Sequence, residues 1–300
     1  MQKFLISFLL LCAGLGAQGT VAHAASLTEG RQQDTATHVL DPVVQWNRAL
    51  LVIVRTPGAQ PATVHPTRSF AILHAAIYDA VNAIDRRHKP YLVTVPAVSP
   101  EASQQAAAAA AGHEVLVGLY PAFKTPLDGE LQQSLAQIAD GQDKTDGIAI
   151  GLAVADRLLA LRSNDNSNAQ PIPYVFGTAP GDYQSTPPNF PPQPQFTHWS
   201  HVVPFALNGA NQFRPGSPPK LTSDAYTDAF NEIKSLGIAN STTATADEAL
   251  TGRFWNGAIQ NYWNEITQTA SQAHNLTTAQ NARLFALLNL SLADGVIAFY

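Results

Sequence analysis

Sulfur is almost absent from this sequence of 300 residues, which contains one cysteine, Cys12, and one methionine, Met1. Both fall within residues 1–24, which have the pattern of a signal peptide. Lys3 supplies a positive charge, a short apolar run follows, and Ala-His-Ala at 22–24 offers a cleavage site. We therefore expect a mature chain with no disulfide, no thiolate nucleophile and no cysteine-ligated metal.

Two explanations fit this lack of sulfur. Secretion makes an unpaired cysteine a liability, so the composition can be a consequence of export alone. A chain without thiols or thioethers also lacks the side chains that oxidants attack, which suits a protein exposed to a strong oxidant. The signal pattern predicts a secreted or periplasmic protein, because its apolar run is shorter than the roughly 20 residues that span a bilayer.

Positive charge is scarce too: 17 lysines and arginines stand against 22 acidic residues, which gives a net charge of −5. A nucleic-acid-binding surface needs clustered basic side chains, and the one cluster here is Arg86, Arg87 and Lys89. We expect no nucleic-acid partner. We also expect no membrane association after signal removal, since no later apolar run reaches spanning length without interruption. With 45% hydrophobic residues, the chain is too apolar to be disordered.

Several motifs of enzyme chemistry are missing from the sequence. It has no G-x-S-x-G elbow, no phosphate-binding loop, no dinucleotide fingerprint and no H-E-x-x-H zinc pair. Thiol and serine-hydrolase mechanisms are thereby disfavoured.

Apolar residues recur at helical spacing through most of the chain and predict an all-α fold. Asp41 followed by Pro42 is typical of a helix start, and Asp143 is a candidate cap for another helix. Six consecutive alanines at 106–111 predict a helix that packs closely. The predicted helices cover residues 42–55, 67–85, 102–120, 126–140, 144–161, 224–236, 245–255, 257–273 and 278–300.

The last predicted helix, capped at Thr277 or Thr278, is apolar on nearly all sides, so we expect it to be fully buried. The sequence stops at Tyr300 without a capping residue or a following loop. These features predict that residues 25–300 are the N-terminal part of one helical domain, truncated at the C-terminus.

Residues 163–220 form a segment of a different kind. It holds 12 of the 21 prolines, which excludes helix interiors and central strands. It also carries many aromatic residues, unlike a polar linker. We predict an ordered loop that covers the helical body.

Histidines are the first candidates for a functional site. His198 and His201 are close enough in sequence to face one ligand. His74 and Tyr78 are one helical turn apart, with Asp79 adjacent. The competing interpretations are a hydrogen-bonded loop histidine and a buried polar network, because two histidines lack a third ligand at recognisable spacing.

Two charged residues are further candidates. Arg253, beside Trp255, is placed to reach an anion, although an exposed or paired arginine is the simpler interpretation. Asp294 lies in the apolar last helix and must have a partner, for which we expect a salt bridge between helices.

Several stretches together resemble one family. The two longest stretches are Asp41–Asn47 and Ala71–Ile84. Shorter stretches follow them along the chain, in the same order as in that family. They are similar to the N-terminal half of bacterial secreted vanadium-dependent haloperoxidases, relatives of type 2 phosphatidic acid phosphatases and bacterial acid phosphatases. The shorter stretches are Val203–Phe205, Gln212–Pro215, Leu221–Ser223, Asn281–Asn289 and Leu292–Asp294.

The resemblance implies a helical bundle around a vanadate or phosphate pocket, built from K-x6-R-P, P-S-G-H and S-R-x3-G-x-x-H motifs. Positively charged side chains and backbone amides would donate hydrogen bonds to the oxyanion there. None of the three motifs occurs in this chain: Arg214-Pro215 has Leu207 where the lysine is required. No residue is therefore assigned as catalytic, cofactor-binding or metal-binding.

The resemblance implies a parent reaction in which peroxide oxidises halide to hypohalite at protein-bound vanadate. Halide and hydrogen peroxide are then the expected partners, and a homodimer is a further expectation. Vanadate is expected for the full-length family and not for this chain alone, which we predict to be inactive. The alternatives are a phosphatase of the same superfamily, which hydrolyses phosphomonoesters, and a non-catalytic secreted helical protein.

Overall fold

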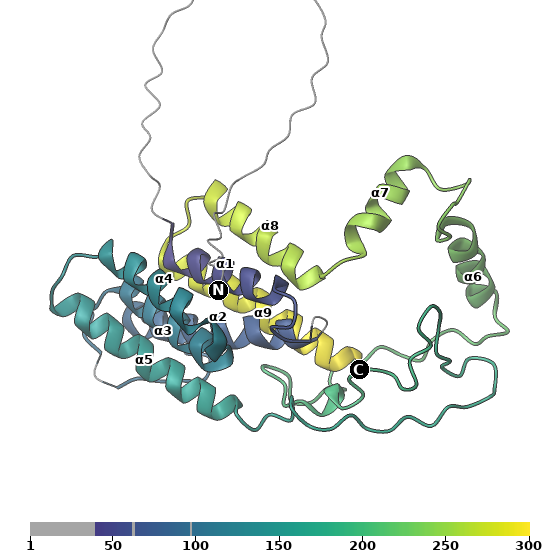
Figure 1. Ribbon diagram of the computed structural model, residues 1–300, viewed down its shortest axis with the longest axis horizontal. Helices are drawn as coiled ribbons and strands as arrows, with labels where there is room; N and C mark the ends of the chain where they lie inside the picture. The colour runs from purple at the N-terminus through teal and green to yellow at the C-terminus, as the bar shows by residue number, and fades with distance from the viewer. Residues whose placement is uncertain (1–39, 62–63, 97) are drawn as a thin grey trace, which may run out of the picture. The chain divides into compact units, whose positions relative to one another are not determined.

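The computed structural model describes residues 40–61, 64–96 and 98–300; the predicted signal peptide at 1–24 lies outside them. In these ranges the chain forms helices and no strand, which confirms the all-α prediction (Figure 1). The α-helices are α1 (Pro42–Arg55), α2 (His65–Asp85), α3 (Gln104–Leu119), α4 (Lys124–Ala136), α5 (Gln142–Arg162), α6 (Asp224–Leu236), α7 (Ala246–Trp255), α8 (Ile259–Ala273) and α9 (Thr278–Phe299).

Side-chain caps begin α1 and α9 as predicted, and α7 has one as well. The Asp41 carboxylate accepts a hydrogen bond of 3.1 Å from the Val43 N–H at the start of α1. The same carboxylate accepts one of 2.6 Å from the Thr278 hydroxyl, so one side chain ties the starts of α1 and α9 together. Thr245 and Thr277 each form a capping box, at α7 and α9.

Several predicted helix boundaries differ from those of the structure. α2 begins at His65, before the predicted start at residue 67. α4 ends at Ala136 and not at 140, because the next two amides bond to carbonyls only three residues back and tighten the chain. Asp143 is no cap: α5 already begins at Gln142, and the Asp143 carbonyl accepts instead from the Ser103 N–H at 2.8 Å.

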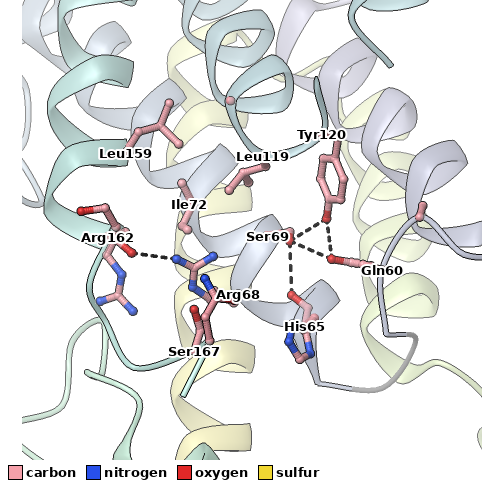
Figure 2. A pocket seen from close by; sticks show the side chains of 14 residues that line it. Gln60, His65, Arg68, Ser69, Ile72, Leu119, Tyr120, Leu159, Arg162 and Ser167 are labelled. Carbon is pink, nitrogen blue, oxygen red and sulfur yellow. Dashed lines mark hydrogen bonds between the residues drawn. The ribbon is translucent and has the colours of Figure 1, made fainter. Parts of the chain in front are cut away.

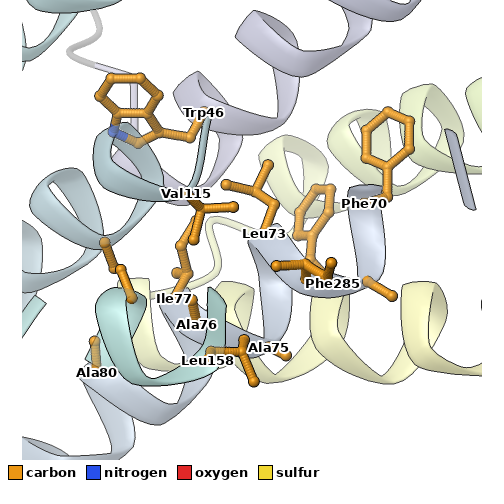
Figure 3. Packing of buried hydrophobic residues seen from close by; sticks show 14 of the residues in the cluster. Trp46, Phe70, Leu73, Ala75, Ala76, Ile77, Ala80, Val115, Leu158 and Phe285 are labelled. Atoms are coloured by element: carbon orange, nitrogen blue, oxygen red, sulfur yellow. The ribbon is translucent and has the colours of Figure 1, made fainter. Parts of the chain in front are cut away.

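Helix α2 lies at the centre of the bundle and packs against α3, α5 and α9. Its apolar side chains meet residues of four other helices, as Figure 3 shows. These neighbours are Trp46 of α1, Val115 of α3, Leu158 of α5 and Phe285 of α9, all at most 1% exposed. The core is therefore shared by segments from both ends of the described chain.

The alanine-rich helix α3 packs closely against α5, as predicted. All six alanines at 106–111 are at most 1% exposed. Two glycines of α5 face them: a Cβ on Gly147 would collide with the Ser103 carbonyl, and one on Gly151 with the Ala107 carbonyl. Small residues on both helices let the two backbones come this near.

A methyl group at Gly151 should therefore destabilise the bundle. We expect Gly151→Ala to lower the free energy of unfolding by about 1–3 kcal/mol, because the added carbon overpacks a backbone contact. Gly129 of α4 is the matched control, since a Cβ there meets nothing within 4 Å. Gly129→Ala should raise stability by about 0.5–1 kcal/mol through helix propensity. Urea unfolding measures both; equal effects would contradict the close packing of α3 and α5.

The prediction that the last helix is fully buried is wrong. Phe285, Ala293 and Ile297 of α9 are at most 1% exposed, whereas Leu287 on another face is 51% exposed. Within the described residues, α9 is the one helix whose length and hydropathy would suit a membrane span, and 39% of that window is buried. Core helices of soluble proteins have the same composition.

The proline-rich segment at 163–220 covers the bundle only in part. Trp199 and Phe205 are buried in the core, and the Tyr91 hydroxyl donates to the Phe205 carbonyl at 2.6 Å. Phe190 and Phe213, in contrast, are 59% and 76% exposed. The part around residues 196–205 therefore packs on the bundle more fully than the rest of the segment.

Candidate functional site

A cavity of about 560 Å³ opens beside α2, α5 and the end of α3 (Figure 2). Its polar lining includes Gln60, His65, Ser69 and Tyr120, which lie together in the figure, and Arg68, which lies beside Arg162. Apolar residues complete the lining, among them Ile72, Leu119 and Leu159. The cavity thus combines a charged end with an apolar wall, which is typical of sites for small molecules.

One buried carboxylate holds two guanidinium groups at the charged end. The Asp165 carboxylate accepts from Arg68 Nε at 2.7 Å and from Arg162 Nε at 3.0 Å. Burial alone would raise the pKa of Asp165, but the hydrogen bond and charge of Arg68, aided by Ser167 and Arg162, outweigh it and lower that pKa. Asp165 is therefore ionised near neutral pH, and two positive charges are balanced by one negative charge.

The two arginines differ in how fully their donors are used. Arg162 also donates to the carbonyls of Val203 and Pro204 at 2.7 and 3.2 Å, and its guanidinium lies 3.8 Å from the centre of the Phe205 ring. Arg162 therefore anchors the covering segment. Arg68 donates to the Arg162 carbonyl at 2.8 Å, and its side chain remains 15% exposed at the cavity.

The neutral polar groups form a chain along the same wall. The Tyr120 hydroxyl lies 2.6 Å from Gln60 Oε1 and 2.7 Å from Ser69 Oγ (Figure 2). Burial raises the pKa of Tyr120 to about 12, so this hydroxyl stays protonated. Two buried nitrogens, Gln60 Nε2 and His65 Nδ1, have no hydrogen-bond partner in the part of the chain that the structure describes.

His65 is a neutral imidazole at this site. Burial, followed by the charge of Arg68, lowers the pKa of His65, and its ring lies 4.8 Å from that of Trp199. The candidate pair His198 and His201 does not converge on one ligand. His198 is buried with Nε2 3.3 Å from the Ser167 carbonyl, whereas His201 is exposed.

The second set of candidates, His74, Tyr78 and Asp79, separates into three structural roles. The Tyr78 hydroxyl donates to the Lys89 carbonyl at 2.7 Å. Asp79 accepts three backbone N–H bonds of 2.6 to 2.9 Å from residues 91–93. Burial raises the pKa of Asp79 and these three hydrogen bonds act against that rise. Asp79 thus fixes the segment after α2.

His74 belongs to a buried network of amides. Asn47 Nδ2 donates to His74 Nε2 at 2.8 Å and to Asn264 Oδ1 at 2.6 Å. Asn264 and Asn289 exchange hydrogen bonds of 2.9 and 3.0 Å, and Gln268 donates to Asn47 Oδ1. All five side chains are at most 8% exposed. The network joins α1, α2, α8 and α9, as the buried-network interpretation predicts.

Asp294 corrects another expectation. It forms no salt bridge among the described residues; its carboxylate accepts the backbone N–H groups of Phe205, Ala206 and Leu207 at 2.6 to 2.9 Å. The expected interhelix ion pair was wrong because three amides already satisfy the charge. Arg253 is exposed on α7, and Arg214 is exposed with its Nη2 3.5 Å from the Ala298 carbonyl.

The cavity residues escaped the sequence analysis. Arg68, Arg162 and Asp165 come from positions up to 97 residues apart, and no short motif links them. One local signal was available: α2 carries an arginine among apolar residues, and α5 carries another at its end. A buried arginine needs an oppositely charged or hydrogen-bonding partner, so each of these residues indicates one. No group of three or more potential metal ligands occurs in ranges 40–61, 64–96 and 98–300.

A comparison with solved structures identifies the fold. The chain is similar to a protein described as the first bacterial vanadium-dependent iodoperoxidase, with a TM-score of 0.64 and 22% sequence identity. The match covers 86% of this chain and 66% of that protein, so the chain spans slightly less than two thirds of its length. No protein-family model and no curated protein sequence matches the chain. The helical fold is that of a vanadium haloperoxidase.

The buried network predicts a pH dependence of stability. Burial lowers the pKa of His74 to about 3, and its Nε2 must accept from Asn47, so protonation opposes the native contacts. An unfolded histidine has a pKa of about 6.5. The contribution of His74 is therefore complete above pH 6.5 and is lost as the pH falls toward 3, at about 1.4 kcal/mol per pH unit.

Urea unfolding at several pH values measures this effect. We expect the difference in free energy of unfolding between wild type and His74→Gln to decrease by about 1.4 kcal/mol for each pH unit between pH 6 and 4.5. The exposed His201 is the control, and His201→Gln should leave the difference constant. A constant difference for His74→Gln would show that His74 titrates normally in the folded protein.

Proposed function

We propose that this chain is the helical, N-terminal part of a secreted or periplasmic vanadium haloperoxidase-like protein, whose reaction is the peroxide-dependent oxidation of halide. The observation that carries the proposal is the fold similarity over 86% of the chain to a vanadium-dependent iodoperoxidase. The family-like stretches support it, because they lie in order along the chain. The signal-like pattern at 1–24 supports export.

In this proposal the chain's own residues build the frame of the enzyme. The residues of the family-like stretches, such as Asn47, His74 and Asp294, bond to one another or to the backbone. The cavity at Arg68 does not fit vanadate, because Arg162 uses its donors on Asp165 and on two backbone carbonyls. One guanidinium edge cannot balance a multiply charged oxyanion, so we derive no chemical step through vanadate on these residues.

The reading frame beyond codon 300 tests the proposal. We expect it to continue into a lysine, six residues, Arg-Pro and a later Pro-Ser-Gly-His. We then expect the longer product, loaded with vanadate, to oxidise iodide or bromide with hydrogen peroxide. The 300-residue chain should show no stoichiometric vanadate complex by vanadium NMR.

Three outcomes would contradict the proposal. A stop codon after Tyr300 would favour a non-catalytic secreted protein. Hydrolysis of an aryl phosphate by the longer product, without any need for peroxide, would favour a phosphatase. A stoichiometric vanadate complex of the 300-residue chain would show that these residues hold the cofactor.

A further inference from the structure

We propose that the cavity at Arg68 binds a small organic monoanion, consisting of one carboxylate on an apolar body. The inference concerns a site at α2, α3 and α5 and does not depend on the proposed halide oxidation. It is drawn from the charge balance, the unpartnered nitrogens and the apolar wall of the cavity.

The charge balance favours a ligand with a single negative charge. Arg68 and Arg162 share the Asp165 carboxylate, which leaves one positive charge in excess at a mostly buried position. His65 adds no charge, because burial lowers its pKa. A monoanion neutralises this excess, whereas a divalent phosphate would bring an uncompensated charge into the cavity.

The hydrogen-bonding groups favour a ligand that accepts. Gln60 Nε2 is a donor, is buried, and has no acceptor in the described ranges. Arg68 uses its Nε on Asp165 and its Nη2 on the Arg162 carbonyl, and the structure records no partner for Nη1 within those ranges. His65 Nδ1 is a third nitrogen at the same wall. A ligand carboxylate can accept from the guanidinium edge of Arg68, and the Gln60 amide is a second donor in the lining of the same cavity.

The size and the apolar wall favour an organic ligand over a bare halide ion. The cavity measures about 560 Å³, which is within the range of small-molecule sites, and a halide ion would fill only a small part of it. Ile72, Leu119 and Leu159 would then remain in contact with water. An apolar tail of a few carbons covers these three side chains and gains burial energy.

Calorimetric titration with three probes tests the proposal. Hexanoate carries the charge and the tail, hexanamide has the same shape without the charge, and bromide has the charge without the tail. We expect hexanoate to bind with one-to-one stoichiometry and at least about tenfold more tightly than hexanamide or bromide. If hexanamide bound as tightly as hexanoate, the charge of the ligand would not matter and that argument would be overturned. If bromide bound as tightly as hexanoate, the argument for an organic tail would be overturned. No binding of hexanoate would overturn the site.

Three variants locate the binding. Gln60→Leu removes the unpartnered donor and Arg68→Gln removes the charge, and each should weaken hexanoate binding by about tenfold or more. Arg157→Gln is the matched control, because it removes the same charge from an exposed position of α5 that does not line the cavity. Far-UV circular dichroism and the Tm confirm the fold of each variant. Unchanged affinity in Gln60→Leu with a native fold, or an equal loss in Arg157→Gln, would contradict the assignment.

Discussion

The buried amide network around Asn47 is the constraint on which the rest of the bundle depends. Asn47 uses both hydrogens of its amide, on His74 and Asn264, and its oxygen accepts from Gln268. A buried polar group without a partner costs about 1–3 kcal/mol, so helices that carry these groups are stable only in the arrangement that pairs them. The network therefore selects one register for α1 and α2 against α8 and α9, which follow roughly two hundred residues later.

Two buried carboxylates hold irregular segments against the helices in a similar way, by accepting hydrogen bonds from the backbone. Asp79 of α2 accepts three successive amides at residues 91–93, and Asp294 of α9 accepts three at residues 205–207. Each acts as a fixed anchor for backbone that has no helix or strand partner. The Asp294 anchor also positions Phe205, on which Arg162 of the cavity packs. The cavity wall thus depends on contacts made far from its opening.

The sequence predicted those features that a short stretch of chain determines. The caps at Asp41 and Thr277 and the close packing of the alanine-rich helix depend on residues within a turn or on side-chain size. Burial of α9 could not be predicted from its composition, because a face of a helix is buried only where another segment covers it. The cap at Asp143 failed because α5 begins one residue earlier, at Gln142, with Gly141 in the N-cap position.

The cavity could not be predicted from the sequence, because its charged groups come together only in the folded chain. The family-like stretches identified residues that matter for architecture, and the structure assigns Asn47, His74, Asp79 and Asp294 to hydrogen bonds that hold the bundle. Residues that bond in this way within the bundle determine the fold more than any chemistry. This is why the resemblance led to the correct architecture without supplying a catalytic residue.

We expect the buried amides to act together as a structural unit, and a double-mutant cycle between Asn47 and Asn264 tests this most directly. Urea unfolding of Asn47→Ala, Asn264→Ala and the double variant gives the coupling free energy. We predict a coupling of about 1 kcal/mol or more, because removing either side chain breaks the hydrogen bond from Asn47 to Asn264 within a connected network. Effects that add within about 0.5 kcal/mol would contradict the account and show that the two amides stabilise the bundle independently.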